Sequence, residues 1–297
     1  MLARMPAPVF GRLLTAMVTP FAADGSLNLD EAKRLASYLV DEMHNDALVI
    51  NGTTGESPTT DDPEKLALLE AVKEAVGDRA MILAGVGTNE TAATISRCQD
   101  AVRAGCDGLL VVTPYYSKPP ADALYEHFEL VAEATELPIM LYDIPGRSGI
   151  PIPEDVIIRL ADHPRIVAVK DAKGDIVSSA RVMAHTDLAY YAGDDAMTLP
   201  LLSVGAVGVV GTSTHFTGAR TKQLIDAFGA GDAEGALAVH RELLDVYTGV
   251  FATQGCMLVK AGLAARGFNP GGLRRPLKPA SEAQAAAFVA LLDAVGL

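Results

Sequence analysis

The sharpest candidate for covalent chemistry is Lys170, which follows the apolar run Ile166–Val169. An amine at the end of such a run is only partly solvated, and desolvation favours its neutral form. The neutral amine is the nucleophile that attacks a carbonyl carbon to form a Schiff base. The competing interpretation is a lysine whose stem is buried while its ammonium group reaches water. A place at the carboxyl end of a buried strand favours the functional interpretation.

Two threonines are candidates for holding a carboxylate near that amine. Thr53 and Thr54 lie between Gly52 and Gly55 in the segment GTTGES. The glycines allow a close backbone approach, so that hydroxyl and amide groups of the turn can bind an anion. The alternative is a threonine-rich turn that only leads into the next helix.

A phenol and a guanidinium follow another apolar run. Tyr142 could relay protons, and the alternative is a core tyrosine whose hydroxyl is satisfied. Arg147 is a natural bidentate clamp for a carboxylate, unless it is an ordinary surface arginine. Tyr115 and Tyr116 are adjacent, so they point different ways on a loop, and one of them could project into a neighbouring subunit.

Other common chemistries have no sequence support. The six histidines are dispersed, without the HxH or HExxH spacing of a metal site. The segment GVGTNE lacks the third glycine of a dinucleotide fingerprint, and neither GxSxG nor a Walker pattern occurs. We therefore expect no metal and no bound cofactor.

The elements that must position these residues are short apolar runs, each followed by a helical pattern. The runs are rich in Val, Ile and Leu and do not alternate with polar residues, which is typical of parallel strands buried on both faces. Eight such units predict an α/β fold, a (β/α)8 TIM barrel, in which the reactive residues meet at the carboxyl ends of the strands. The runs are 13–19, 47–52, 81–86, 108–114, 138–144, 165–171, 188–194 and 207–212.

The last part of the chain predicts helices without further strands. From Gly218 onward the pattern is helical, and the first of these helices is expected to complete the barrel. We predict a barrel over residues 11–229 and a C-terminal helical region over 230–297 that packs on it. Earlier in the chain, Asp62 before Pro63 and Asn89 are expected to cap helices, and Gly77 is expected to end one.

Composition narrows the possible partners and the compartment. The formal net charge of −13 repels phosphate backbones, so nucleic acid is excluded as a partner. The three cysteines are scattered, as in a reduced protein of the cytoplasm. The first residues contain no signal peptide, and no run reaches the roughly 18 apolar residues that a membrane span needs. We expect a cytoplasmic protein without membrane contact.

The ordered motifs GTTGES, VTPYYSKPP, YDIPGRSG and VAVKDA resemble the dihydrodipicolinate synthase family, within the superfamily that includes N-acetylneuraminate lyase. The resemblance extends from about Gly11 to the C-terminus and is greatest to actinobacterial members. It implies a lyase of lysine and diaminopimelate biosynthesis. That lyase condenses pyruvate with L-aspartate 4-semialdehyde to 4-hydroxy-tetrahydrodipicolinate, as a homotetramer built from two tight dimers.

The resemblance also implies a role for each candidate. Lys170 forms the covalent pyruvate imine, which replaces any cofactor. The pyruvate carboxylate is held by Thr54 and the neighbouring amides of the Gly52 turn. Tyr142 is the acid and base, in a proton relay with Thr53 and with Tyr116 of the adjacent subunit. Arg147 binds the carboxylate of the semialdehyde.

Two departures from the family pattern bear on the substrate. Ser148 replaces a threonine and keeps the hydroxyl. The family often has GVIS where this chain has residues 208–211 as GVVG, and a backbone carbonyl near Val210 is expected to face the site. The run GTSTH that follows could therefore shape the substrate pocket differently.

Feedback inhibition by lysine is predicted to be weak or absent. Members that lysine inhibits tend to carry His and Glu at an interface site, where this chain has Asp62, Lys65 and Ala93. Asn89 and Tyr115 are retained there.

Two other functions stay open at this point. One is a related aldolase that acts on a 2-keto-3-deoxy sugar acid or on N-acetylneuraminate. The other is a non-catalytic paralogue that binds a keto acid or serves as an assembly partner.

Overall fold

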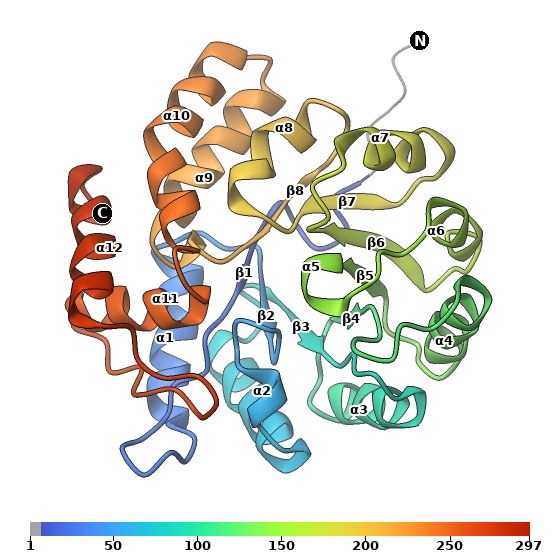
Figure 1. Cartoon of the computed structure of the whole chain (residues 1–297), viewed down its shortest axis with the longest axis horizontal. Coiled ribbons are helices and arrows are strands. Elements are labelled where there is room, and N and C mark those ends of the chain that lie inside the picture. Colours follow the sequence, from blue (N-terminus) through green and yellow to red (C-terminus); the bar gives the residue numbers. More distant parts are fainter. Residues whose placement is uncertain (1–6) are drawn as a thin grey trace.

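The computed structural model describes residues 7–297, and within them eight parallel strands form a closed barrel in the order β1 to β8. Figure 1 shows the helices around this ring. The predicted barrel is thereby confirmed. The strands are β1 (Leu13–Ala16), β2 (Ala47–Ile50), β3 (Met81–Gly85), β4 (Gly108–Val112), β5 (Ile139–Asp143), β6 (Ile166–Asp171), β7 (Ala189–Ala192) and β8 (Gly208–Gly211).

Successive side chains of a strand point alternately into the barrel and toward the helices. Leu14 and Val49 belong to the cluster inside the barrel, whereas Leu13 and Leu48 pack in the layer between strands and helices. Both faces of these strands are buried, which explains why the runs are apolar throughout. Lys170 lies two residues after Ala168, on the inward side.

Helices cover the outside of the barrel, and a short helix, α5, follows β5 directly. Two caps show why the chain turns where it does: Asp61 and Glu64 form a capping box at the start of α2, and Gly77 ends that helix with φ 60°. The helices are α1 (Leu29–Asp41), α2 (Asp62–Val76), α3 (Thr91–Arg103), α4 (Ala121–Glu133), α5 (Pro145–Ser148), α6 (Glu154–Leu160), α7 (Ile176–His185), α8 (Thr198–Leu202) and α9 (Thr214–Gly229).

Three further helices, α10 (Ala233–Gly249), α11 (Gly255–Ala265) and α12 (Glu282–Ala294), form the C-terminal appendage. They lie together on one side of the barrel (Figure 1). Phe288 of α12 contacts Phe216 of α9 edge-on, with ring centroids 5.8 Å apart. The appendage is therefore packed on the barrel, while a domain boundary at residue 230 stays a prediction.

Several predicted boundaries need correction. Except for β6, the strands end before the apolar runs do, because turn residues such as Met17 and Val18 are themselves buried. Helix α9 begins at Thr214, ahead of the expected start at Gly218. Asp171, not Lys170, is the last residue of β6.

Two predicted caps were wrong by one residue. Asp61 caps α2 in place of Asp62, and Glu90 precedes α3 in place of Asn89. The expectation about a signal peptide falls partly on residues 1–6, which lie outside the described part of the chain.

Candidate active site

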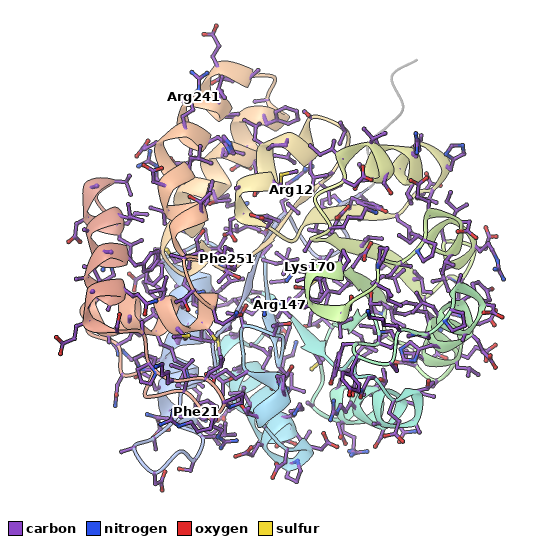
Figure 2. All side chains as sticks on the ribbon, viewed as in Figure 1. Arg12, Phe21, Arg147, Lys170, Arg241 and Phe251 are labelled. Carbon is purple, nitrogen blue, oxygen red and sulfur yellow. The ribbon has the colours of Figure 1, made fainter. Side chains whose placement is uncertain are left out.

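A cavity of about 690 Å³ opens at the carboxyl ends of the strands. Five of the predicted residues line it: Thr53, Thr54, Tyr142, Arg147 and Lys170. Figure 2 shows Lys170 and Arg147 near the middle of the ring, with Phe251 on the side of the C-terminal helices. The barrel thus brings together residues that are far apart in sequence.

Lys170 lies at the inner wall of this cavity, and its side chain is buried. Burial lowers the pKa of Lys170 to about 8, while the charge of Asp195 raises it and that of Arg147 lowers it further. Its Nζ lies 4.3 Å from the ring centroid of Tyr142. Near pH 8 a large fraction of this lysine is therefore the free amine.

Tyr142 is held against Lys170 by the register of the sheet, which pairs the two residues across β5 and β6. Burial raises the pKa of Tyr142 to about 12, whereas the charge of Arg147 and a hydrogen bond with Thr53 lower it. The phenol is therefore protonated at neutral pH and can donate a proton within the cavity.

The turn after β2 supplies the two threonines. The carbonyl oxygen of Gly52 accepts from the amides of Gly55 and Ser57, at 3.0 and 3.3 Å. These bonds close the turn on itself. At the cavity wall, Thr54 Oγ1 lies 3.4 Å from Oγ1 of Thr212, which follows β8. The turn therefore presents both threonine side chains to the cavity.

Arg147 lies on α5, directly above the end of β5. Its Nη1 donates to Oε1 of Gln254 at 2.9 Å, and both side chains are exposed to the cavity. The remaining donors of the guanidinium are available for an anionic ligand. Gln254 thus orients the arginine from the side of the appendage.

Three predicted residues do not line the cavity. Gly52 shapes the turn through its backbone, and Val210 is buried in the cluster inside the barrel. Tyr116 is 90% exposed with φ 75°, and projects away from the body of the chain. Its neighbour Tyr115 packs instead, with its hydroxyl 3.3 Å from Thr88 Oγ1.

Sequence reasoning missed the aspartates after β7, whereas Thr212 and Ser213 belong to the GTSTH run that was expected to shape the pocket. Asp195, in the short 3-10 helix η2 (Asp195–Met197), is buried and accepts from the amides of Thr212 and Ser213 at 3.0 Å. It also accepts from Ser213 Oγ at 2.6 Å. Asp194 and Thr212 line the cavity itself. Inspection of the end of the seventh run, as of the others, could have found the two aspartates.

The second missed group comes from the appendage, which forms one wall of the cavity. Phe251, Gln254 and Cys256 contribute from around the start of α11, and Pro276 and Leu277 from the segment before α12. No sequence signal pointed to them, because they follow the last strand and belong to no strand end.

A buried ion pair holds this wall to the threonine turn. Lys260 Nζ donates to Glu56 Oε1 and to the carbonyl of Gly272, both at 2.7 Å. The other oxygen of Glu56 accepts from the amide of Arg274 at 3.0 Å. The GTTGES segment therefore anchors the C-terminal wall as well as presenting Thr53 and Thr54.

Over residues 7–297, no three His, Cys, Asp or Glu side chains are grouped so that they could hold a metal ion. In the same range, no helix is long and apolar enough to cross a membrane.

Known proteins resemble the chain over almost its whole length. Residues 9–295 match the Dihydrodipicolinate synthetase family. The 4-hydroxy-tetrahydrodipicolinate synthase of Cutibacterium acnes is 60% identical over 97% of this chain and 99% of its own length. The 4-hydroxy-tetrahydrodipicolinate synthase of Acidothermus cellulolyticus is 62% identical over 95% of this chain and 91% of its own length. The DHDPS of Cyanidioschyzon merolae, solved with lysine bound, is 38% identical with a TM-score of 0.95, over 97% and 99% of the two chains.

Proposed function

This chain belongs to the dihydrodipicolinate synthetase family, and from that membership we infer its reaction and propose the residues that carry it out. It is a lyase of lysine and diaminopimelate biosynthesis. It condenses pyruvate with L-aspartate 4-semialdehyde to 4-hydroxy-tetrahydrodipicolinate. The observation that carries the assignment of residues is the buried, weakly basic amine of Lys170 inside the cavity.

In the first step, the neutral amine of Lys170 attacks the ketone carbon of pyruvate. The carbinolamine loses water and becomes an imine, which joins pyruvate covalently to the chain. The pyruvate carboxylate binds at the turn of Thr53 and Thr54, whose hydroxyls face the cavity. Thr54 and the neighbouring amides thereby hold the keto acid with its carbonyl toward the amine, while Thr53 belongs to the proton relay with Tyr142.

Tyr142 transfers the protons that these steps require. Its phenol lies beside Lys170 and is hydrogen-bonded to Thr53. It donates a proton to the leaving hydroxyl and then takes one from the methyl group of the imine, which becomes an enamine. Tyr116 of a neighbouring subunit completes the relay, a role that its 90% exposure supports.

Arg147 binds the carboxylate of L-aspartate 4-semialdehyde at the opposite side of the cavity. The enamine attacks the aldehyde carbon and forms the new carbon–carbon bond. The amine of the second substrate then attacks the imine carbon, closes the ring and releases Lys170. Because the protonated imine is itself the electron sink, we propose that the reaction needs no metal or redox cofactor.

We propose a homotetramer built from two tight dimers, as in the family, in which the exposed Tyr116 of one subunit reaches the cavity of its dimer partner. We also propose the cytoplasm, which agrees with three buried free cysteines.

Borohydride reduction in the presence of pyruvate tests the covalent step. We expect a stable mass increase on Lys170 and none in the Lys170→Ala variant. Lys65 is an internal control, because burial also lowers its pKa to about 8 while the lysine lies outside the cavity. Labelling of Lys65 in place of Lys170 would refute the assignment, and no labelling at all would support a keto-acid-binding paralogue.

Substrate profiling at fixed pyruvate tests the second substrate. We expect consumption of L-aspartate 4-semialdehyde. Cleavage of a 2-keto-3-deoxy sugar acid or of N-acetylneuraminate, without consumption of the semialdehyde, would favour the related aldolase instead.

A further inference from the structure

The charged residues of the cavity differ in how far they are already engaged. Among the residues that the structure describes, four charged side chains line the cavity: Glu56, Arg147, Lys170 and Asp194. Glu56 is buried, and both of its oxygens accept hydrogen bonds, one from Lys260 and the other from the backbone amide of Arg274. In the proposed reaction, Lys170 is the nucleophile and Arg147 binds a carboxylate. Asp194 has no role there.

Asp194 is nevertheless positioned at the cavity by backbone hydrogen bonds. The amide of Gly193 donates to the carbonyl of Asp171 at 2.7 Å, which ties the end of β7 to the end of β6. A Cβ atom at position 193 would lie 2.9 Å from the Cβ of Ala172 and 3.0 Å from the Asp171 carbonyl oxygen, so a larger residue would disturb this close approach. Asp194 Oδ1 accepts from the amide of Ala196 at 3.0 Å, and the side chain is exposed. Its other oxygen is free to accept from a ligand.

The second substrate has a group for which the proposed mechanism names no partner. L-aspartate 4-semialdehyde carries an ammonium group next to its carboxylate, and an ammonium group is a triple donor that needs acceptors. A guanidinium cannot serve, because it has no acceptor atom. A carboxylate gives the strongest such bond.

The geometry points to Asp194 as a specificity-determining residue that binds the ammonium group of the second substrate while Arg147 binds its carboxylate. This inference rests on the proposed function. Lys170 is on β6 and Asp194 follows the adjacent strand β7, so the bound ammonium group would lie beside the imine carbon. After it loses a proton, its nitrogen is the amine that attacks this carbon and closes the ring. Asp194 would thus favour binding of an aldehyde that carries an amino group over an aldehyde that lacks it.

Asp194→Asn is a conservative test, because asparagine also caps a helix through its side-chain oxygen. Asp175 offers a matched control. It too is exposed and caps a helix, accepting from the amide of Ser178 at 3.0 Å, and it does not line the 690 Å³ cavity. Asp175→Asn therefore removes a similar charge at a similar cap without touching the proposed subsite.

The experiment compares the KM for L-aspartate 4-semialdehyde with the inhibition constant of succinate semialdehyde, which keeps the carboxylate and the aldehyde but lacks the amine. In D194N we expect the KM to rise about tenfold, the effect of one partly solvated charge-assisted hydrogen bond. The inhibition constant of the analogue and the KM for pyruvate should stay within about twofold. D175N should leave all three constants unchanged.

Two results would overturn the inference. A D194N variant with an unchanged KM would show that Asp194 does not bind the amine. Equal losses for the semialdehyde and its analogue would show a general effect on the cavity instead. If the wild-type chain traps pyruvate but consumes no L-aspartate 4-semialdehyde, the proposed function fails as well, and the borohydride result distinguishes that failure from the other two.

Discussion

At the scale of single residues, Lys170 illustrates how a functional group works against folding. The barrel removes its amine from water, and burial lowers the pKa of the amine from 10.5 to about 8, which is the basis of the nucleophilic role proposed for it. In the unfolded chain the same lysine binds its proton more tightly. Below pH 8 the folded protein must therefore accommodate a buried ammonium group, which costs stability.

Replacing Lys170 by methionine should consequently stabilise the protein. We expect a gain of about 3 kcal/mol in the free energy of unfolding at pH 7, from the difference between the folded and unfolded pKa values. The gain should be complete below pH 8 and should shrink as the pH rises toward 10.5, where both states hold the neutral amine. Thermal unfolding between pH 7 and pH 9.5 measures this trend.

Lys33, a surface lysine on α1, provides the control for that series. Lys33→Met should change the melting temperature little at any pH. If K170M melts at the temperature of the wild type across the range, then burial does not disfavour the ammonium form as argued.

At the scale of elements, the segment GTTGES joins two parts of the site. Its threonines face the cavity, and its Glu56 pairs with Lys260 of α11, where both side chains are almost completely buried at 1% and 3% exposed. A buried ion pair contributes little by itself, but removal of one partner leaves the other charge uncompensated. The C-terminal wall therefore depends on Glu56.

Glu56→Gln should destabilise the protein by about 3–5 kcal/mol, because the Lys260 ammonium group loses its counter-charge. Pro276 and Leu277 should be less well fixed, so the KM for the second substrate should rise. Denaturant unfolding and steady-state kinetics measure the two effects. The double variant E56Q/K260M should regain most of the stability, and failure to do so would assign the loss to another cause.

The elements also show what the sequence could and could not predict. The eight apolar runs revealed the barrel, because strands buried on both faces carry a strong signal, and the strand ends revealed Lys170, Tyr142 and the threonine turn. The element ends were less accurate, since Met17 and Val18 are buried within a turn. Gln254 and Leu277 could not be found, because only tertiary packing brings them to the cavity.

At the scale of the whole molecule, the distribution of charge favours capture of anions at one place. The chain carries a net charge of −13, yet Arg147 and Lys170 lie together in the cavity. The general field repels anionic substrates at a distance, while the two local cations attract them at the mouth of the barrel. We therefore expect substrate affinity to come from these contacts and not from long-range steering.

For regulation of the whole molecule, we predict that L-lysine inhibits the enzyme weakly or not at all. At the positions concerned, Asp62 already pairs with Arg97 at 2.8 Å, and Lys65 is a buried cation that would repel a lysine ligand. Steady-state rates should change little up to millimolar L-lysine. The DHDPS of Cyanidioschyzon merolae, solved with lysine bound, is a suitable comparison, and strong inhibition of this chain at micromolar lysine would contradict the prediction.

The division of the cavity wall between barrel and appendage has a consequence for the synthesis of the protein on the ribosome. Residues from Thr53 to Thr212 line one part of the cavity, and residues from Phe251 to Leu277 line the other. A nascent polypeptide that has only just left the ribosome with its eighth strand cannot yet enclose a ligand. Messages truncated before codon 277 should therefore yield chains whose cavity lacks part of its second wall, although the barrel residues proposed to bind pyruvate are already present.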